Sequence, residues 1–372
     1  MAAYLMIMIV LAAALGVYVY HTVKRIMKFY GFNTSGKFLR MVNIALVIYV
    51  IVSCVNMWNT SAMVLLHIVA LFILTDMIAL VLKKLCKSWS TYKAYKVCRK
   101  LYGCGLLPVV ITILLLGYGY ENMKHVVKTQ YFVETTKNVS NYRIVLITDT
   151  HYGTIQSPDI LKNRISEINT QSPDIVILGG DIVEEGTSKE SMQEIFGLLG
   201  MLNSKYGIYY VYGNHDRQPY TDSRSYTDEE LTEAITENGI SILEDENVVI
   251  QDDLVLAGRG DAAWGGTSGR ASTEEILEGA DRNKYIVMAD HQPIAAEENN
   301  AQGVDLQLSG HTHAGQIWPV GWLSELAGVL NYGEYQKGNC KVIVSSGFTG
   351  WGYPVRTEGN CEYVIIDIMA VP

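Results

Sequence analysis

The feature that most limits how this chain can fold is a series of four apolar runs in its first third, at residues 1–20, 41–58, 62–82 and 103–120. Each run approaches the roughly 20 residues that a helix needs to cross a bilayer. No basic segment precedes the first run and three more runs follow it, so it resembles a retained helix more than a cleaved signal peptide. We therefore expect an N-terminal four-helix transmembrane region over residues 1–120.

The charged residues divide the chain at about the same point. Fourteen of the 29 lysines and arginines, but only two of the 38 acidic residues, lie within residues 1–130. The basic residues gather in two loops without acids, at 21–40 and 83–100, and the positive-inside rule places both in the cytoplasm. We therefore expect a multi-pass protein of the cell membrane whose acidic later domain is extracytoplasmic. The strong negative charge of that domain argues against nucleic acid as a partner.

One acid, Asp76, lies inside the third apolar run. An ionisable side chain at that depth is a candidate functional residue. No second acid or conduction motif accompanies it, so a partner on a neighbouring helix or a place near the membrane interface is favoured over an ion path. The role of the membrane helices beyond anchoring stays open.

Two of the six cysteines, Cys340 and Cys361, belong to the later domain, and each precedes a predicted strand. Neighbouring strands could bring them together, and an extracytoplasmic location would permit a disulfide. Two free thiols are the alternative. No CxxC motif occurs in the chain, which argues against a thiolate zinc site.

Five predicted strands in the later domain each end in a polar residue of metal-ligand type. We expect the strands at 142–149, 174–181, 207–216, 284–291 and 304–313, with helices at 157–169 and 188–203. In open α/β sheets, sites form beyond the carboxyl ends of the strands. The strand ends carry Asp149, His151, Asp181, Asn214, His215, His291, His311 and His313. We therefore predict an α/β fold in which these side chains converge on one site.

These motifs resemble those of the calcineurin-like metallophosphoesterases. The matching stretches are DTH at 149–151, GD at 180–181, GNHD at 213–216, His291 and GHTH at 310–313. Together with GHTHAGQ at 310–316, the segment SSGFTGWGYPVR at 345–356 is similar to a membrane-associated bacterial branch, the YkuE/YaeI-type phosphoesterases. The resemblance implies a four-layer α/β/β/α sandwich over residues 141–372, joined to the membrane region by a linker at 121–140.

The resemblance also implies a site for two divalent metal ions. Asp, His and Asn donors suit Mn, Fe or Zn better than Ca or Mg. Seven candidate ligands are too many for one ion and about right for two. The resemblance assigns Asp149, His151 and His313 to one ion, Asn214, His291 and His311 to the other, and Asp181 to both.

Two further residues are implied to act in catalysis. His215 is placed to protonate the leaving oxygen or to stabilise the charged transition state. Asp216 could set the tautomer of that imidazole and raise its pKa, and a solvated loop acid is the alternative. Relatives often have another polar residue three positions after the bridging aspartate. Glu184 occupies this position and could support the metal ligands without binding the metal itself.

Other residues near the motifs have two interpretations. Arg356 could bind the anionic substrate, because a guanidinium fork suits phosphate oxygens, or it could form a surface salt bridge. Trp264, Trp318, Trp322 and Trp351 lie in loops. They could line a substrate groove or reach lipid headgroups, and ordinary packing is the alternative.

The resulting hypothesis is a membrane-anchored metal-dependent phosphoesterase in which a metal-bridging hydroxide attacks a phosphate ester. A membrane-associated substrate is expected, and a lipid-linked phosphate is one candidate. The alternative is a metal-binding sensor or scaffold, or a module associated with a transporter, without turnover. Monoesterase or diesterase activity, the native metals and the oligomeric state stay open.

Overall fold

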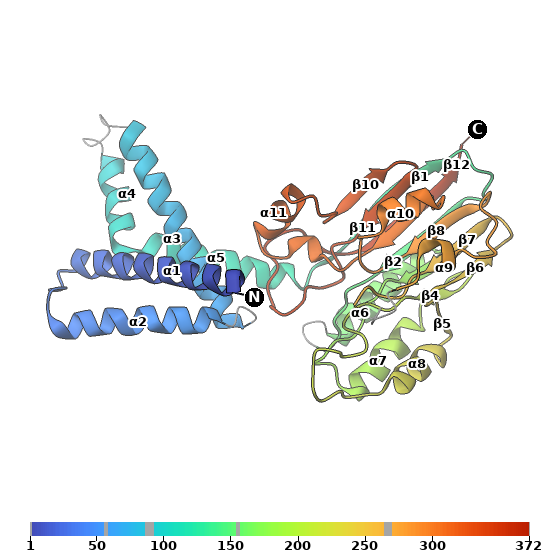
Figure 1. The fold of residues 1–372 in the computed structure, drawn as a ribbon, viewed down its shortest axis with the longest axis horizontal. Helices are drawn as coiled ribbons and strands as arrows, with labels where there is room; N and C mark the ends of the chain where they lie inside the picture. The colour runs from blue at the N-terminus through green and yellow to red at the C-terminus, as the bar shows by residue number, and fades with distance from the viewer. Residues whose placement is uncertain (1, 56–58, 86–92, 154–156, 264–269, 372) are drawn as a thin grey trace. The chain divides into compact units, whose positions relative to one another are not determined.

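The computed structural model describes residues 2–55, 59–85, 93–153, 157–263 and 270–371 (Figure 1). The chain forms two compact units, Met1–Tyr118 and Gly119–Pro372. The first unit consists of helices and the second of two β-sheets with further helices.

The described residues of the first unit form five α-helices. They are α1 (Ala2–Phe29), α2 (Lys37–Val55), α3 (Thr60–Leu85), α4 (Lys93–Cys104) and α5 (Leu106–Asn122), the last of which ends in the second unit. Among the described residues, three stretches are long and apolar enough to cross a membrane: Ile9–Phe29, Lys37–Cys54 and Thr60–Leu82. The fourth expected span is α5, with 17 residues, whose length of about 25 Å is less than the roughly 30 Å of the hydrocarbon core. The described residues therefore include three helices of full spanning length where four were expected.

Asp76 has its partner on a neighbouring helix, as expected. Nη1 of Arg25 lies 2.7 Å from Oδ1 of Asp76, and the hydroxyl of Tyr18 donates to Oδ2 at 2.8 Å. Arg25 also donates to the hydroxyl of Tyr102 on α4. The acid is thus part of an ion pair between α1 and α3.

The second unit contains two six-stranded mixed sheets, as expected for an α/β fold. The first has the order β1 (Val126–Thr135), β12 (Cys361–Ala370), β2 (Tyr142–Ile147), β3 (Ile175–Leu178), β4 (Ile208–Tyr210), β5 (Ile240–Ile242). The second has the order β10 (Gly333–Lys337), β11 (Cys340–Val344), β9 (Leu306–Ser309), β8 (Tyr285–Ala289), β7 (Leu254–Gly258), β6 (Glu246–Ile250). Strands β2 to β5 run parallel, and so do β7, β8, β9 and β11.

The apolar core lies in three layers. One cluster joins the first sheet to α6 (Pro158–Thr170), α7 (Lys189–Leu199) and α8 (Asp228–Thr236). A second joins the two sheets, with Ile144 and Ile177 on one side and Leu256 and Val287 on the other. A third joins the second sheet to α9 (Thr273–Ile276) and α10 (Ala296–Ala301). Because both faces of each sheet are covered at its centre, the strands β3, β7 and β8 are apolar along their whole length.

The structure differs from expectation at the predicted linker, residues 121–140. That segment contains β1, whose ten residues pair in parallel with β12. Its burial alternates along much of its length, as is typical of an edge strand with one face on the core. The linker is therefore part of the second unit.

Cys340 and Cys361 do not form a disulfide. Both thiols are buried and free. Cys340 begins β11 in the second sheet, whereas Cys361 begins β12 in the first. The alternative of a disulfide is wrong because the two strands belong to different sheets.

Candidate metal centre

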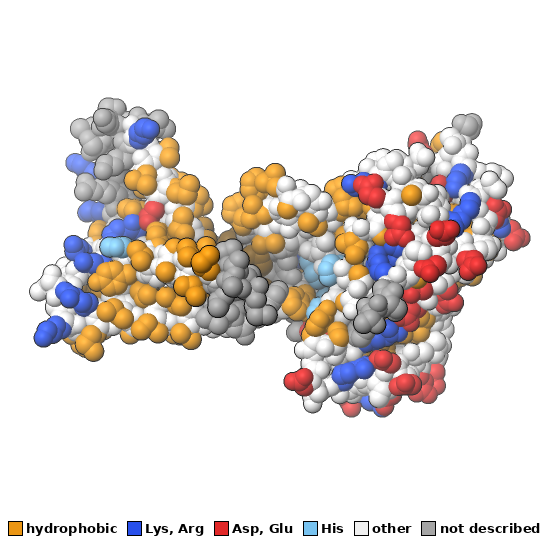
Figure 2. Space-filling view, in the orientation of Figure 1, with side chains coloured by type: hydrophobic (Ala, Val, Ile, Leu, Met, Phe, Trp, Pro, Cys, Tyr) orange, Lys and Arg blue, Asp and Glu red, His pale blue; other side chains and the backbone are white. Residues whose placement is uncertain are grey.

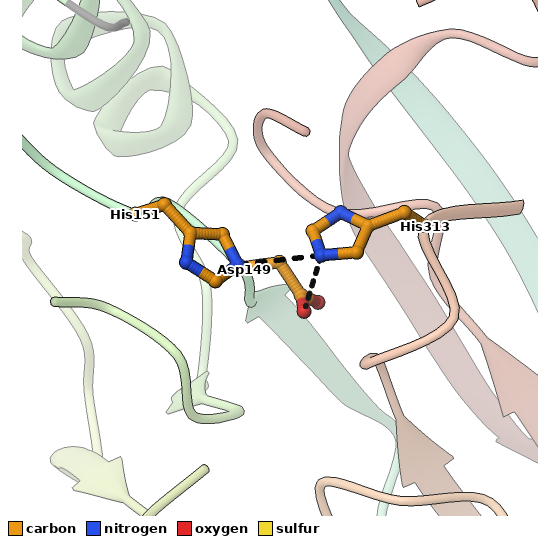
Figure 3. Close-up of side chains that lie close together, drawn as sticks. All are labelled: Asp149, His151 and His313. Atoms are coloured by element: carbon orange, nitrogen blue, oxygen red, sulfur yellow. Dashed lines mark hydrogen bonds and ion pairs between the residues drawn. The ribbon is translucent and has the colours of Figure 1, made fainter. Parts of the chain in front are cut away.

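Two groups of acids and histidines gather beyond the carboxyl ends of the central strands. In each group the possible ligand atoms all lie within 4.8 Å of one another. The first group, shown in Figure 3, consists of Asp149, His151 and His313. The second consists of Asp181, His291 and His311. The structure thus brings together six of the seven predicted metal ligands.

Both sheets contribute to this centre. Asp149 and His151 follow β2, and Asp181 follows β3, in the first sheet. His291 follows β8, and the His311–His313 segment follows β9, in the second sheet. The backbone N–H of His311 donates to the Asp149 carboxylate at 3.1 Å, which joins the two sheets at the site.

The backbone at this centre is held in a costly conformation. Non-glycine residues rarely adopt positive φ, and each case costs on the order of 1–3 kcal/mol. Hydrogen bonds from Asp149 N to Gly180 O (2.9 Å) and from His151 N to Asp181 O (3.1 Å) hold the turns in place. The ligand-type residues with positive φ are Asp149 (54°), His151 (40°), Asp181 (51°), His311 (71°) and His313 (51°). Such clustering is typical of a functional site.

The imidazoles are oriented by hydrogen bonds on their far side. Nδ1 of His291 lies 2.8 Å from the carbonyl of Gly179, and Nδ1 of His313 lies 3.2 Å from that of Thr349. A carbonyl can only accept, so each Nδ1 carries a proton and each Nε2 faces inward. This is the arrangement that metal-binding histidines adopt.

The inward nitrogens face carboxylate oxygens at short range. Nε2 of His291 lies 3.1 Å from Oδ2 of Asp181, and Nε2 of His313 lies 3.5 Å from Oδ1 of Asp149. Such a contact is repulsive unless a proton or a metal ion lies between the nitrogen and the oxygen. The residues present therefore fit bound cations.

His151 and Asn214 complete the set of donors. Nδ1 of His151 lies 3.2 Å from the Glu184 carboxylate, which is the supporting contact expected of Glu184. Asn214, the seventh predicted ligand, precedes His215, whose backbone N–H donates to Oδ1 of Asp181 at 2.8 Å. Among the described residues, Oδ1 of Asn214 is buried without a hydrogen-bond partner. It is thus a buried acceptor in the segment that contacts Asp181.

The imidazoles of the centre differ in their protonation. Burial lowers the pKa of His313 to about 3, so that imidazole is neutral at pH 7. Burial alone would raise the pKa of Asp181, but the imidazoles of His291, His151 and His215 lower it far below its usual range. Burial would lower the pKa of His291 too, but the negative charge of Asp181 raises it well above its usual value. Metals bind neutral imidazoles and ionised carboxylates, so a metal ion would have to displace a proton from His291.

The partner of His215 differs from the predicted one. Its Nδ1 lies 2.7 Å from the carboxylate of Glu185, and its ring centroid lies 5.0 Å from that of Trp351. Burial would lower the pKa of His215, but the hydrogen bond to Glu185 and the negative charges of Asp181, Glu185 and Glu184 together raise it. The Glu184-Glu185 pair after Asp181 was the only sequence signal, and it could not show which glutamate reaches which imidazole.

Asp216 has a structural role, so the prediction that it sets the tautomer of His215 is wrong. The Asp216 side chain is fully buried, and its carboxylate accepts hydrogen bonds from the backbone N–H groups of Asp181 (2.9 Å), Ile182 (2.8 Å), Val183 (3.2 Å) and Gly213 (2.6 Å). Asp216 therefore stabilises the turn that carries Asp181.

Arg356 is also structural, which contradicts its predicted contact with substrate. Its side chain is fully buried, and its guanidinium donates to three carbonyls: those of His313 (2.8 Å), Ser346 (2.8 Å) and Thr349 (2.6 Å). Arg356 therefore stabilises the loop that carries His313 through hydrogen bonds to its backbone and to that of residues 346–349.

The predicted tryptophans separate into different environments. Trp318 and Trp322 are exposed, and Trp351 contacts His215. Trp264 lies outside the described residues.

Comparisons with known proteins agree with this geometry. A family model described as calcineurin-like phosphoesterase matches residues 142–315. An uncharacterized metallophosphoesterase of Helicobacter pylori (strain J99) is 30% identical over 71% of this chain and 70% of its own length. The uncharacterized metallophosphoesterase YkuE of Bacillus subtilis is 29% identical over 68% of this chain and 90% of its own.

The name of a further relative describes a transmembrane protein. The "transmembrane protein with metallophosphoesterase domain" of Danio rerio is 29% identical over 69% of this chain and 61% of its own length. The same family is indicated by the sequence motifs, by the two groups of ligand-type residues and by the sequence identity to these relatives. The chain therefore belongs to the calcineurin-like metallophosphoesterases, a family of phosphate-ester hydrolases.

Proposed function

We propose that this protein is a membrane-anchored phosphoesterase with a two-metal centre. The observation that carries the proposal is the pair of adjacent Asp/His groups, whose imidazole nitrogens face carboxylate oxygens. One ion would be held by Asp149, His151 and His313, and the other by Asn214, His291 and His311. The catalytic unit would be the four-layer α/β/β/α sandwich of the family, with β1 included.

Asp181 is the residue that would bridge the two ions. Its Oδ2 lies 3.1 Å from Nε2 of His291 in the second group and 3.9 Å from Nε2 of His151 in the first. One carboxylate oxygen thus faces imidazoles of both groups. Two ions of the Mn, Fe or Zn type, when bound, would supply the Lewis acidity that activates a water and polarises the phosphate ester.

His215 would serve as the proton donor to the leaving oxygen. Its Nδ1–H is engaged by Glu185, so Nε2 is the atom left to exchange a proton with substrate. Glu185 is a positioning residue that holds the ring and favours its protonated form. Asp216 and Arg356 support the loops and touch no reacting atom in this proposal.

The membrane topology is part of the proposal. We infer that α5, at the short end of the spanning range, completes a fourth crossing after α1, α2 and α3. Both basic segments would then be cytoplasmic and the catalytic unit extracytoplasmic. If α5 did not cross, the catalytic unit would share the side of the basic residues 83–100. Reporters fused after residue 90 and after residue 372 distinguish these cases, because only four crossings place them on opposite sides.

The activity is tested with the purified full chain, stripped with chelator and assayed with and without Mn²⁺. The substrates are a chromogenic phosphodiester and a chromogenic phosphomonoester. Turnover that returns with metal and is absent in Asp181→Ala supports the proposal, and the ratio of the two rates identifies the ester class. Metal binding without turnover of either soluble ester or of lipid phosphates would instead favour a metal-binding scaffold.

A further inference from the structure

An exposed apolar surface follows the His311–His313 motif directly. It is centred on α11 (Val320–Leu326), and Figure 2 shows hydrophobic side chains gathered over that helix. Large contiguous patches of this kind on a folded unit mark interaction sites. The members, here called the α11 patch, are Trp318, Val320, Trp322, Leu323, Leu326 and Val329, each between 46% and 67% exposed.

The backbone beneath the α11 patch is firmly held. The carboxylate of Glu358 accepts from the backbone N–H groups of Gly321 at 2.9 Å and Trp322 at 3.1 Å. Oγ1 of Thr357 accepts from the N–H of Trp318 at 3.0 Å. The apolar side chains are therefore presented outward by an ordered scaffold.

The same scaffold holds the end of the apolar helix α5. The N–H of Arg356 donates to the carbonyl of Gly119 at 3.0 Å. Nδ2 of Asn122 donates to the carbonyls of Arg356 at 3.2 Å and Gly359 at 2.9 Å. Residues 356–359 thus bind both the last turn of α5 and the first turn of α11. The α11 patch lies beside the point where the chain arrives from its membrane helices.

The composition of the patch fits a lipid bilayer. Residues 317–332 contain Trp318, Trp322 and Tyr332 with aliphatic side chains, and Glu325 is the only charged residue in that stretch. Aromatic and aliphatic side chains of this kind favour the interface between headgroups and acyl chains. Without lysine or arginine, attraction to anionic lipids would contribute little.

The patch is also connected to the metal centre. The η2 turn (His313–Gly315) precedes α11. Gly315 has φ +76°, and a Cβ there would collide with the backbone nitrogen of Gly321. The first turn of α11 therefore packs on the loop that carries His313.

We propose that the α11 patch inserts into the surface of the bilayer beside the end of α5 and holds the metal centre at the level of the lipid headgroups. The substrate that reaches the centre is then a phosphate ester carried by the bilayer. This last step rests on the proposed phosphoesterase activity, whereas the insertion does not.

Insertion is tested with the full chain reconstituted in phosphatidylcholine nanodiscs. Leu326→Cys is labelled with an environment-sensitive fluorophore, and Val329→Cys serves as a second site if the first variant does not fold. The matched control is Met201→Cys, because Met201 is an apolar residue of similar exposure (60%) that follows α7. Labelled wild-type chain corrects for the native cysteines. Quenching is measured with nitroxide-bearing lipid and with aqueous iodide.

We expect lipid nitroxide to quench the label at Leu326 several-fold more than the label at Met201, and iodide to quench it less. Equal quenching at the two sites would show that the patch faces water and would overturn the proposal. Protection from both quenchers would also overturn it, because a protein partner such as a second copy would then cover the patch. Neither readout requires turnover.

The substrate is tested with Leu323→Glu/Leu326→Glu, and Met201→Glu is the control. The double variant should hydrolyse a water-soluble ester at the wild-type rate. A lipid-borne ester of the same class should be hydrolysed at least about tenfold more slowly, because insertion of charged side chains is disfavoured. Equal loss on both esters would overturn the link to a bilayer substrate. Inactivity of the wild-type chain on both, with quenching as expected, would refute the proposed activity and leave the insertion standing.

Discussion

Replacement of Arg356 by methionine tests whether its guanidinium is structural. The change removes the donors to the carbonyls of His313, Ser346 and Thr349, all of which belong to buried residues. The carbonyls of His313 and Thr349 keep the N–H of Gln316 and Nδ1 of His313 as donors, so each loses one of two hydrogen bonds. The carbonyl of Ser346 is left without a partner among the described residues, and a buried acceptor in that state costs about 1–3 kcal/mol. Part of this cost is offset, because the described residues form no ion pair with Arg356 and its charge is itself costly to bury.

We expect a net destabilisation of about 2–4 kcal/mol from these opposing effects. For a unit of this size that corresponds to a decrease in melting temperature of about 4–16 °C. The affinity for metal should also fall about 10–100-fold, because the His313 loop loses its support.

The assay is thermal unfolding of the full chain in detergent, followed by metal titration. Arg224→Met is the matched control, since Arg224 forms an exposed pair with Asp228 that contributes at most about 1 kcal/mol. An unchanged melting temperature in Arg356→Met, combined with a raised KM for the phosphate ester, would refute the reasoning. That result would mean that the guanidinium reaches the substrate.

Three further changes address the centre itself. Glu185→Gln should lower kcat about 10–100-fold at unchanged metal content, because it weakens the hold on Nδ1 of His215; an unchanged kcat would contradict this role. Asp181→Asn should lower the occupancy of both metal ions, measured by elemental analysis of the purified chain, and loss of only one ion would argue against a bridge. Gly315→Ala should destabilise the catalytic unit by at least about 2 kcal/mol, because φ is positive and a Cβ would collide with Gly321; an unchanged melting temperature would disprove that clash.

The convergence of the ligand-type residues could be predicted because it depends on local pattern. An apolar strand followed by Asp149, Asp181 or His291 is visible along the chain, and parallel strands bring their carboxyl ends to the same edge. The contacts behind these residues could not be predicted. Whether Glu185 or Asp216 contacts His215 depends on the path of two loops. The sequence alone does not distinguish which of several nearby acidic residues makes the contact.

The sequence by itself determined the division into an apolar helical region and an α/β phosphoesterase, because hydropathy, charge and strand periodicity are properties of short stretches. It also determined which residue types end the central strands. Only the tertiary structure decided that β1 belongs to the first sheet, that Arg356 is buried, and that the α11 patch is exposed. Each of these depends on contacts between distant residues, such as Arg356 with His313 and β1 with β12. Such contacts follow from how the layers pack, and no local pattern records them.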